Sequence, residues 1–193
     1  MFHRCKSSVR VSAGFCLLIA WFAVINGWKV LTVVLSASAV HELGHWMALR
    51  VLGADILGFR IGIFGAVLET DQRSLSYGQE LIATLAGPAA NLLGAVLLTA
   101  GGFETAAGAH LVLGGFNLLP MRPLDGGRAC YLMTACLFGP VAGEWITRVA
   151  GTVTGTVQAA GLIILMVKSG GNLWLLPAVF GALMAAIQEC FGK

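Results

Sequence analysis

The sequence predicts an all-α polytopic membrane protein with six transmembrane helices and a small β-strand element at the cytoplasmic membrane face. Composition is the first reason, because 58% of the 193 residues are hydrophobic, 11% are charged and the mean hydropathy is +0.85, values far too apolar for a soluble domain of this length. Charged residues also separate apolar runs that are long enough to cross about 30 Å of hydrocarbon. We therefore expect one transmembrane domain that covers residues 1–193.

The six predicted spans are bounded by charged residues, glycines and prolines. They cover residues 11–27, 30–49, 79–100, 105–119, 149–167 and 173–190. The first span follows a short basic head, so a cleaved signal peptide is the competing interpretation, although no A-x-A-like cleavage site follows. Gly87-Pro88 interrupts the third span. Because proline removes a helix hydrogen bond, we expect this part of the helix to face the protein interior.

The segment between the second and third spans has a different character. Residues 56–68 have a glycine-punctuated composition of β type, which predicts short strands or a hairpin at the membrane face. A polypeptide in an extended conformation could pair with this stretch by β-addition. Under this hypothesis, proline at Ile61 or Ile63 impairs the pairing.

Basic residues are distributed unevenly about the six spans. With a cytoplasmic N-terminus, ten of the twelve Lys and Arg residues fall on the cytoplasmic side, and only Lys29 and Lys168 fall outside. The positive-inside rule therefore predicts that the N-terminus and the C-terminus are both cytoplasmic. Because the net charge of +3 arises mostly at span ends, it indicates topology and does not indicate nucleic-acid binding.

The second span carries the motif His41-Glu42-Leu43-Gly44-His45 in its second half. On a helix, His41 and His45 lie one turn apart on one face and can share a metal ion, while Glu42 is turned roughly 100° from His41. This H-E-x-x-H pattern is typical of sites where two imidazoles bind Zn²⁺ and the glutamate is the general base of peptide hydrolysis. A pair of hydrogen-bonded histidines in a helix core is the alternative.

A catalytic zinc site needs a third protein ligand and an open position for water. Val51 stands where a metzincin-type motif requires histidine, so that class is excluded. His110 and Glu69 are alternatives, but His110 is expected in the outer half of its span and Glu69 in the polar interfacial stretch. Asp125 is the better candidate, because it follows two prolines at the depth expected for the histidines and a carboxylate near the bilayer needs a cation. A cap of the following helix is the other interpretation of Asp125.

Three motifs follow one another along the chain: His41-Glu42-Leu43-Gly44-His45, Ala86-Gly87-Pro88-Ala89-Ala90-Asn91, and Asn117-Leu118-Leu119-Pro120 leading to Leu124-Asp125-Gly126-Gly127. In this order they resemble the motif set of the site-2 proteases, zinc metalloproteases that cut within membranes. The compact six-span form is similar to the stage IV sporulation protein FB branch. The resemblance implies one metal and catalytic set, namely His41, His45 and Asp125 as zinc ligands, Glu42 as general base, and Asn91 and Asn117 as supports for substrate or oxyanion.

The resemblance also implies partners and a location. It implies regulated intramembrane proteolysis of a membrane-bound protein, such as a sigma-factor precursor in a spore-forming bacterium, with regulatory or inhibitory membrane proteins as further partners. The location implied is the bacterial cell membrane. Some members of this branch carry a nucleotide-sensing CBS domain after the last span. The sequence stops at Lys193, so we expect no regulation through such a domain.

Other interpretations of these residues follow from the sequence as well. Asn91 and Asn117 are amides in or beside apolar helices, and such amides commonly form hydrogen bonds between helices. The His, Glu and Asp residues would also suit the relay of a metal or proton transporter. A catalytically inactive scaffold is a third possibility, which the intact Glu42 disfavours.

Overall fold

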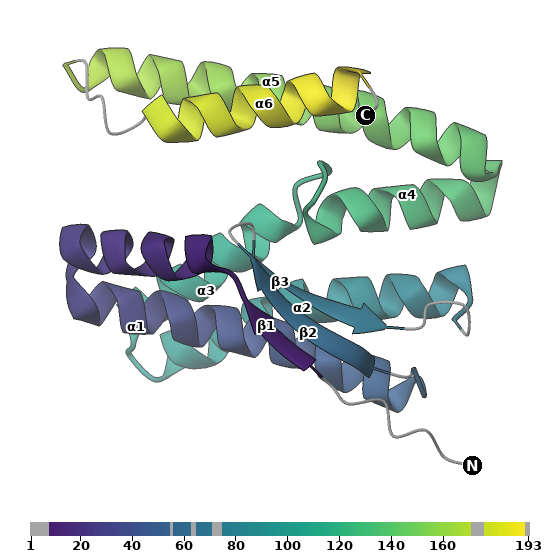
Figure 1. Ribbon diagram of the computed structural model, residues 1–193, viewed down its shortest axis with the longest axis horizontal. Helices are drawn as coiled ribbons and strands as arrows, with labels where there is room; N and C mark the ends of the chain where they lie inside the picture. Colours follow the sequence, from purple (N-terminus) through teal and green to yellow (C-terminus); the bar gives the residue numbers. More distant parts are fainter. Residues whose placement is uncertain (1–7, 55, 63–64, 71–74, 171–175, 192–193) are drawn as a thin grey trace. The chain divides into compact units, whose positions relative to one another are not determined.

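The computed structural model describes residues 8–54, 56–62, 65–70, 75–170 and 176–191. The chain forms two compact units, Met1–Phe116 and Asn117–Lys193. The first unit contains, in chain order, β1 (Ser8–Val11), α1 (Ala13–Val51), β2 (Ile56–Gly62), β3 (Gly65–Thr70), α2 (Tyr77–Ala100) and nearly all of α3 (Glu104–Asn117). The second contains α4 (Asp125–Phe138), α5 (Pro140–Lys168) and α6 (Leu176–Phe191) (Figure 1).

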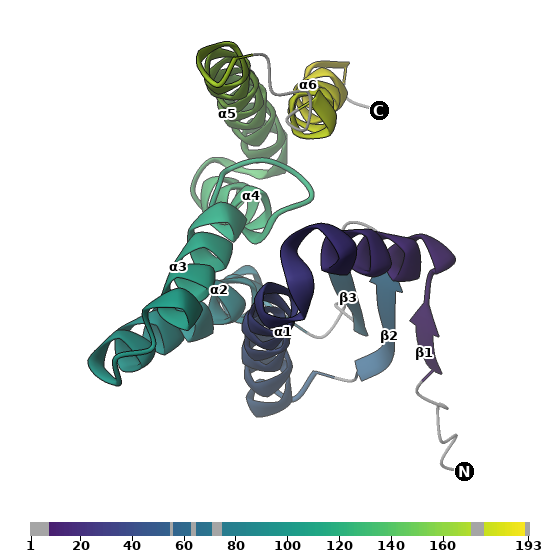
Figure 2. The ribbon, with the colours of Figure 1, turned by 90° about the vertical axis from the view of Figure 1, so that its left-hand side faces the viewer.

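Helix α1 is divided by a sharp bend at Gly27, which both ribbon views show (Figures 1 and 2). A straight helix of its 39 residues would be about 58 Å long, yet β1 before it and β2 after it pair in one sheet. The chain therefore has to turn back. Gly27 has φ +78 and ψ 163, a conformation that glycine adopts without strain. The bend falls where predicted spans 11–27 and 30–49 meet.

A three-stranded sheet of order β1-β2-β3 flanks α1, with β1 parallel and β3 antiparallel to β2. Strands β2 and β3 occupy the segment predicted as strands, whereas β1 was not expected. Ile61 lies opposite Val11 on one side and Ala66 on the other, so β2 is paired on both sides, and the expected β-addition to residues 56–68 stays a prediction. Ile63 lies outside the described residues. An added strand can pair only with the outer strands, β1 and β3.

Helix α2 begins at a capping box and continues through a proline. Ser76 Oγ accepts a hydrogen bond from the Gln79 amide at 3.4 Å, and Gln79 Oε1 accepts one from the Ser76 amide at 3.0 Å. These bonds satisfy amides that the first helical turn leaves without partners, so the helix begins slightly before the predicted residue 79. Gly87 and Pro88 are both buried. The expectation that this part of the helix faces the protein interior is confirmed.

Small side chains repeat along α5 and let its neighbours approach closely. Every fourth position along one face is small and buried, namely Gly143, Thr147, Gly151, Gly155 and Ala159. An added Cβ at Gly143 would lie 2.9 Å from Ala135 Cα on α4, and one at Gly155 would lie 3.0 Å from Ala186 Cβ on α6. Such small-residue faces are the usual means by which membrane helices pack.

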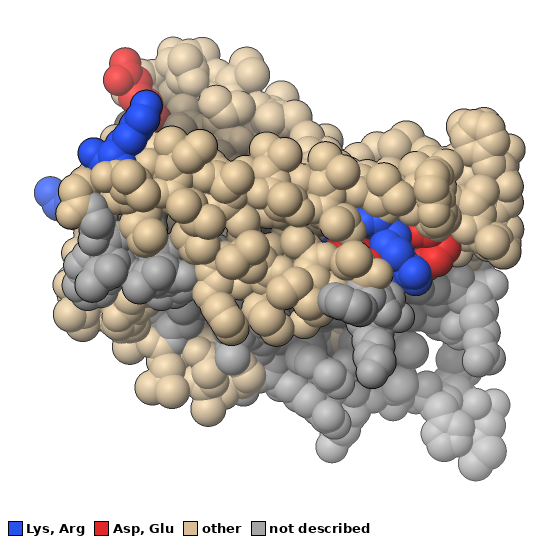
Figure 3. All heavy atoms as spheres, turned by 90° about the horizontal axis from the view of Figure 1, so that it is seen from above, with Lys and Arg blue, Asp and Glu red and all other residues tan. Residues whose placement is uncertain are grey.

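Among the described residues, three helices are long and apolar enough to cross a membrane: α1, α2 and α5. Large apolar side chains cover their surfaces, and the face of α5 and α6 in Figure 3 is almost free of charge. These helices indicate a membrane protein. With its 14 residues, α3 is about 21 Å long, short of the roughly 30 Å of a hydrocarbon core. The count of six spans, the single domain and the membrane face beside the sheet stay predictions.

Candidate metal centre

His41 and His45 lie on the second arm of α1, and their rings converge. His41 is 5% exposed, and His45 is half-buried. The two Nε2 atoms are 3.1 Å apart, with ring centroids 4.8 Å apart and ring planes at 80°. The one-turn spacing predicted from the sequence thus places the two outer nitrogens at one point in space.

One face of α2 holds both imidazoles, through Ala83, Gly87 and Asn91, which are spaced four residues apart. His45 Nδ1 lies 2.8 Å from the carbonyl oxygen of Ala83. Since a carbonyl can only accept, this nitrogen is the donor, and a neutral His45 therefore carries its lone pair on Nε2. Gly87 leaves room for the ring, because an added Cβ would lie 2.6 Å from His45 Cε1 and 2.7 Å from Cδ2. Ala83 and Gly87 were not predicted to contact the histidines.

Asn91 is 0% exposed and contacts the other imidazole. Its Nδ2 lies 3.1 Å from His41 Nδ1, and its Oδ1 has no hydrogen-bond partner among the described residues. The oxygen and nitrogen of an asparagine amide exchange places on a half-turn of the group, and the hydrogen-bond network decides between the two orientations. With Oδ1 toward His41, the amide accepts from Nδ1–H and His41 Nε2 keeps its lone pair. With Nδ2 toward His41, that lone pair is lost to a proton.

The donor set and its geometry fit zinc. Two nitrogens bound at about 2.05 Å to a tetrahedral ion are about 3.3 Å apart, close to the 3.1 Å between the two Nε2 atoms. A histidine that binds a metal ordinarily donates its second ring N–H to a carbonyl, a carboxylate or a similar acceptor. Ala83 provides that acceptor for His45, and the unpartnered oxygen of Asn91 is suited to provide it for His41.

Glu42 follows His41 on the same helix and is half-buried. Its position one residue along turns its side chain roughly 100° from that of His41 about the helix axis. Leu43 and Trp46 are exposed. The carboxylate therefore stands at the border between the buried histidine face and the exposed surface of α1.

The remaining predicted site residues, Asp125 and Asn117, belong to the second unit. Asp125 is the first residue of α4 and is half-buried, and the N-cap position is held by Leu124 without a side-chain cap hydrogen bond. The interpretation of Asp125 as the N-cap is therefore wrong. Asn117 is the last residue of α3 and is half-buried. Its role in substrate or oxyanion support stays a prediction, as does that of Asn91.

Glycines hold the chain before Asp125 close to α4. A Cβ on Gly126 would overlap the carbonyl of Leu118, and a Cβ on Gly127 would lie 2.6 Å from the carbonyl carbon of Met121 and 2.9 Å from the amide nitrogen of Arg122. The backbone of residues 118–124, which we call the 118–124 loop, therefore packs directly on the first turn of α4. Only glycine permits this contact, which explains the Gly126-Gly127 pair after Asp125.

His110 and Glu69 were the alternative candidates for the third ligand, and the structure describes the side chain of His110 only. His110 is 5% exposed and packs against Gly94 of α2, where an added Cβ would lie 2.7 Å from its Nδ1. The Glu69 side chain is outside what the structure describes.

Known proteins are similar to this chain in sequence and in fold. No family model matches the chain. Rip3 of Mycobacterium tuberculosis is 29% identical over 183 residues, covering 84% of this chain and 45% of that protein. Zinc metalloprotease MJ0392 of Methanocaldococcus jannaschii is 33% identical over 130 residues, covering 59% of this chain and 38% of that protein. The solved structure of a site-2 protease from Methanocaldococcus jannaschii covers 98% of this chain and 93% of that chain with a TM-score of 0.66 at 24% identity.

The chain has the fold of the solved site-2 protease, and the relatives that it matches in sequence are named as zinc metalloproteases. It spans less than half the length of these curated relatives. In this fold the H-E-x-x-H segment of α1 lies against α2. These similarities support membership of the site-2 protease family, and the stage IV sporulation protein FB branch stays a prediction.

Proposed function

We propose that this chain is a zinc metalloprotease that hydrolyses peptide bonds of membrane-associated or transmembrane proteins. The observation that carries the proposal is the convergence of the His41 and His45 Nε2 atoms at 3.1 Å, beside Glu42 on an apolar helix. Two held imidazoles with an adjacent carboxylate are suited to metal-assisted hydrolysis. The zinc metalloprotease MJ0392 among the relatives supports the same reaction.

Each residue of the site has a separate role in the proposed reaction. When bound, Zn²⁺ supplies a Lewis acid that makes water more acidic and polarises a carbonyl. His41 and His45 hold it through Nε2, with Ala83 fixing the orientation of His45 and Asn91 that of His41. Glu42 takes a proton from the attacking water and returns it to the leaving amine. We propose Asp125 as the third ligand, because Gly126 and Gly127 fix its backbone and a carboxylate completes a two-histidine catalytic set.

The substrate and topology belong to the same proposal. A helical substrate hides its carbonyls in hydrogen bonds, so a segment that unwinds or is extended at the site is required. A membrane-bound regulatory precursor, such as that of a sigma factor, would meet this requirement, and membrane proteins that restrain the enzyme are expected partners. The charge distribution supports cytoplasmic N- and C-termini in a bacterial membrane, and the pairing of β1 with β2 brings both ends of α1 to one side.

A vesicle assay tests the function directly. The full chain is reconstituted in lipid vesicles with a single-span membrane protein that contains a helix-breaking segment, and mass spectrometry identifies new termini. We expect cleavage that stops on addition of a zinc chelator and resumes with added zinc. A zinc-sensitive dye inside the vesicles tests the transporter alternative, which requires zinc or proton flux without cleavage. Binding of the substrate without cleavage in any condition would support the scaffold instead.

Replacing Asp125 with alanine is expected to lower zinc affinity by more than about 100-fold, since it removes a direct ligand. The measurement is competition with a chromophoric chelator on the purified full chain. Glu104→Ala is the matched control, because Glu104 is likewise a carboxylate in the first turn of a helix but is exposed on α3. Equal zinc affinity in the two variants would show that Asp125 contributes only to helix α4 and does not bind the metal.

Asn91 provides a test of how His41 is held. Asn91→Leu is expected to lower zinc affinity by about 10- to 100-fold, the range typical of residues that hold a metal-binding histidine. Asn91→Asp should retain affinity, because a carboxylate still accepts from His41 Nδ1–H. Thr99→Val on the same helix is the control, since Thr99 bonds only the carbonyl of Ala95 in the contacts observed. If aspartate weakens zinc as much as leucine does, Asn91 does not act as the acceptor.

A further inference from the structure

Helix α6 carries one buried carboxylate whose role the sequence did not suggest. Glu189 is 5% exposed and lies near the end of an otherwise apolar helix. A carboxylate in such surroundings is costly unless hydrogen-bond donors or cations satisfy it. Its Oε1 accepts a hydrogen bond from the backbone N–H of Arg122 at 2.8 Å, across 67 residues of sequence. An ionisable residue in an apolar span was the signal that could have identified it.

The Glu189 carboxylate packs against Gly151 of α5. An added Cβ at Gly151 of α5 would lie 3.0 Å from Glu189 Cγ and 3.1 Å from its Oε1. One turn further along α5, Gly155 makes the equivalent contact with Ala186 of α6 at 3.0 Å. Glycine at position 151 therefore makes room for the carboxylate itself, whereas glycine at 155 only allows the two helices to approach.

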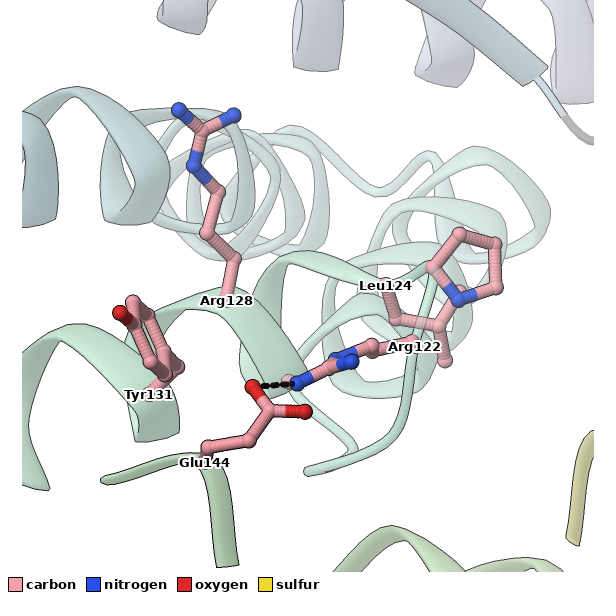
Figure 4. A pocket seen from close by; sticks show the side chains of 7 residues that line it. Arg122, Leu124, Arg128, Tyr131 and Glu144 are labelled. Atoms are coloured by element: carbon pink, nitrogen blue, oxygen red, sulfur yellow. Dashed lines mark hydrogen bonds and ion pairs between the residues drawn. The ribbon is translucent and has the colours of Figure 1, made fainter. Parts of the chain in front are cut away.

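Arg122 is held from a second direction by α5. Its Nη2 donates to Glu144 Oε2 at 2.6 Å (Figure 4). Glu144 Oε1 also lies 3.6 Å from Arg148 Nη2. The hydrogen bond that Arg122 donates to Glu144 raises the pKa of the Arg122 guanidinium above its usual value, although burial opposes this. The two side chains of the ion pair are 47% and 40% exposed, so solvent weakens this contact. The part-buried, charge-assisted bond from the Arg122 backbone N–H to Glu189 is the firmer attachment.

The Arg122 amide is also part of the packed backbone ahead of Asp125. The Leu124 amide donates to the Met121 carbonyl at 3.0 Å, and an added Cβ at Gly127 would lie 2.9 Å from the Arg122 nitrogen. Any shift of Arg122 must therefore shift the first turn of α4. The hydrogen bond that Glu189 of α6 accepts from Arg122 thereby influences the position of Asp125, which lies three positions further along the chain.

We propose that Glu189 is a positioning residue that anchors the 118–124 loop and thereby fixes the Asp125 carboxylate. The effect on metal binding rests on the proposed function, in which Asp125 is a zinc ligand. The anchoring of the loop does not depend on that function. The carboxylate acts as a hydrogen-bond acceptor for the backbone and takes no part in proton transfer.

Two sets of variants of the full chain test this proposal. Glu189→Leu removes the acceptor, Glu189→Gln keeps an acceptor oxygen, and Gln188→Leu changes the exposed neighbouring residue. Gly151→Ala crowds the carboxylate, and Gly155→Ala crowds Ala186 to the same degree. Hydrogen exchange of the 118–124 amides is measured without zinc, and zinc affinity is measured by chelator competition.

Glu189→Leu and Gly151→Ala are expected to speed exchange of the 118–124 amides at least about tenfold and to lower zinc affinity about 10- to 100-fold. Glu189→Gln should stay within about threefold of the parent, because its oxygen still accepts the bond. Gln188→Leu should match the parent, and Gly155→Ala, which crowds α6 without contacting the carboxylate, should change loop exchange less than Gly151→Ala does. Parental behaviour of Glu189→Gln would distinguish a positioning role from a general loss of packing. If Glu189→Leu does not fold, the comparison of Gly151→Ala with Gly155→Ala tests the anchoring instead.

Each other outcome overturns a defined part of the proposal. Unchanged exchange of the loop in Glu189→Leu and Gly151→Ala would show that the carboxylate does not anchor it. Faster exchange with unchanged zinc affinity would show that the anchor has no bearing on the metal. If the parent binds no zinc, the proposed function fails, and the exchange data alone then decide whether Glu189 anchors the loop.

Discussion

Glu42→Gln is expected to lower peptide cleavage by about 10²- to 10⁴-fold, the range that general acid–base catalysis contributes, while zinc content stays at the parental value. Glutamine has nearly the same size as glutamate but cannot take a proton from water. His41 and His45 keep their contacts with α2, so the metal site itself should remain. The measurement is single-turnover cleavage in vesicles, combined with metal analysis of the same preparation.

Glu104→Gln makes the same chemical change at an exposed position on α3 and should leave cleavage unchanged. Parental activity in Glu42→Gln would remove Glu42 from the mechanism even if zinc is present. A transporter would keep its flux and show no cleavage in either form, and a scaffold would bind substrate equally in both.

Gly87→Ala is expected to abolish zinc binding at the histidine pair, because the added methyl group would occupy the space of the His45 ring. The ring atoms Cε1 and Cδ2 lie 2.6 and 2.7 Å from the site of the new Cβ, well inside van der Waals contact. His45 must rotate away. This rotation breaks its hydrogen bond to the Ala83 carbonyl and moves its Nε2 away from Nε2 of His41. We expect zinc affinity to fall by more than about 100-fold, more than the loss of a supporting residue causes.

Gly94→Ala is the matched control for this variant. On the same helix, it places a methyl group 2.7 Å from Nδ1 of His110, a histidine that we do not assign to the metal. Both variants should lower thermal stability, since each crowds a buried ring. Only Gly87→Ala should lose zinc, and equal zinc affinity in the two would exclude His45 as a ligand. Gly78→Ala, with nothing within 4 Å, should behave as the parent.

Local features of this protein could be predicted from the sequence because they depend on short-range geometry. The convergence of His41 and His45 follows from a four-residue spacing on a helix. The burial of Gly87 and Pro88 follows from the need to compensate a missing hydrogen bond. In each case the residues involved are neighbours along the chain, so the helical period alone places them.

Other features required knowledge of which segments meet. The sequence indicated a strand at Ile61, but the addition of β1 made β2 central and closed both of its edges. Asp125 had the composition of a cap, yet the structure places Leu124 in that position. Short strands and helix boundaries depend on segments that lie elsewhere in the chain, and the local sequence does not predict which segments these are.

By itself, the sequence determined a membrane protein with an H-E-x-x-H helix, since hydropathy and helical spacing are properties of short segments. Only the tertiary structure decided that Ala83 and Asn91 hold the two imidazoles and that Glu189 holds the amide of Arg122. These contacts join residues separated by 38, 50 and 67 positions. Their existence depends on how helices pack, and packing is set by shape complementarity across the fold rather than by any repeat within one helix.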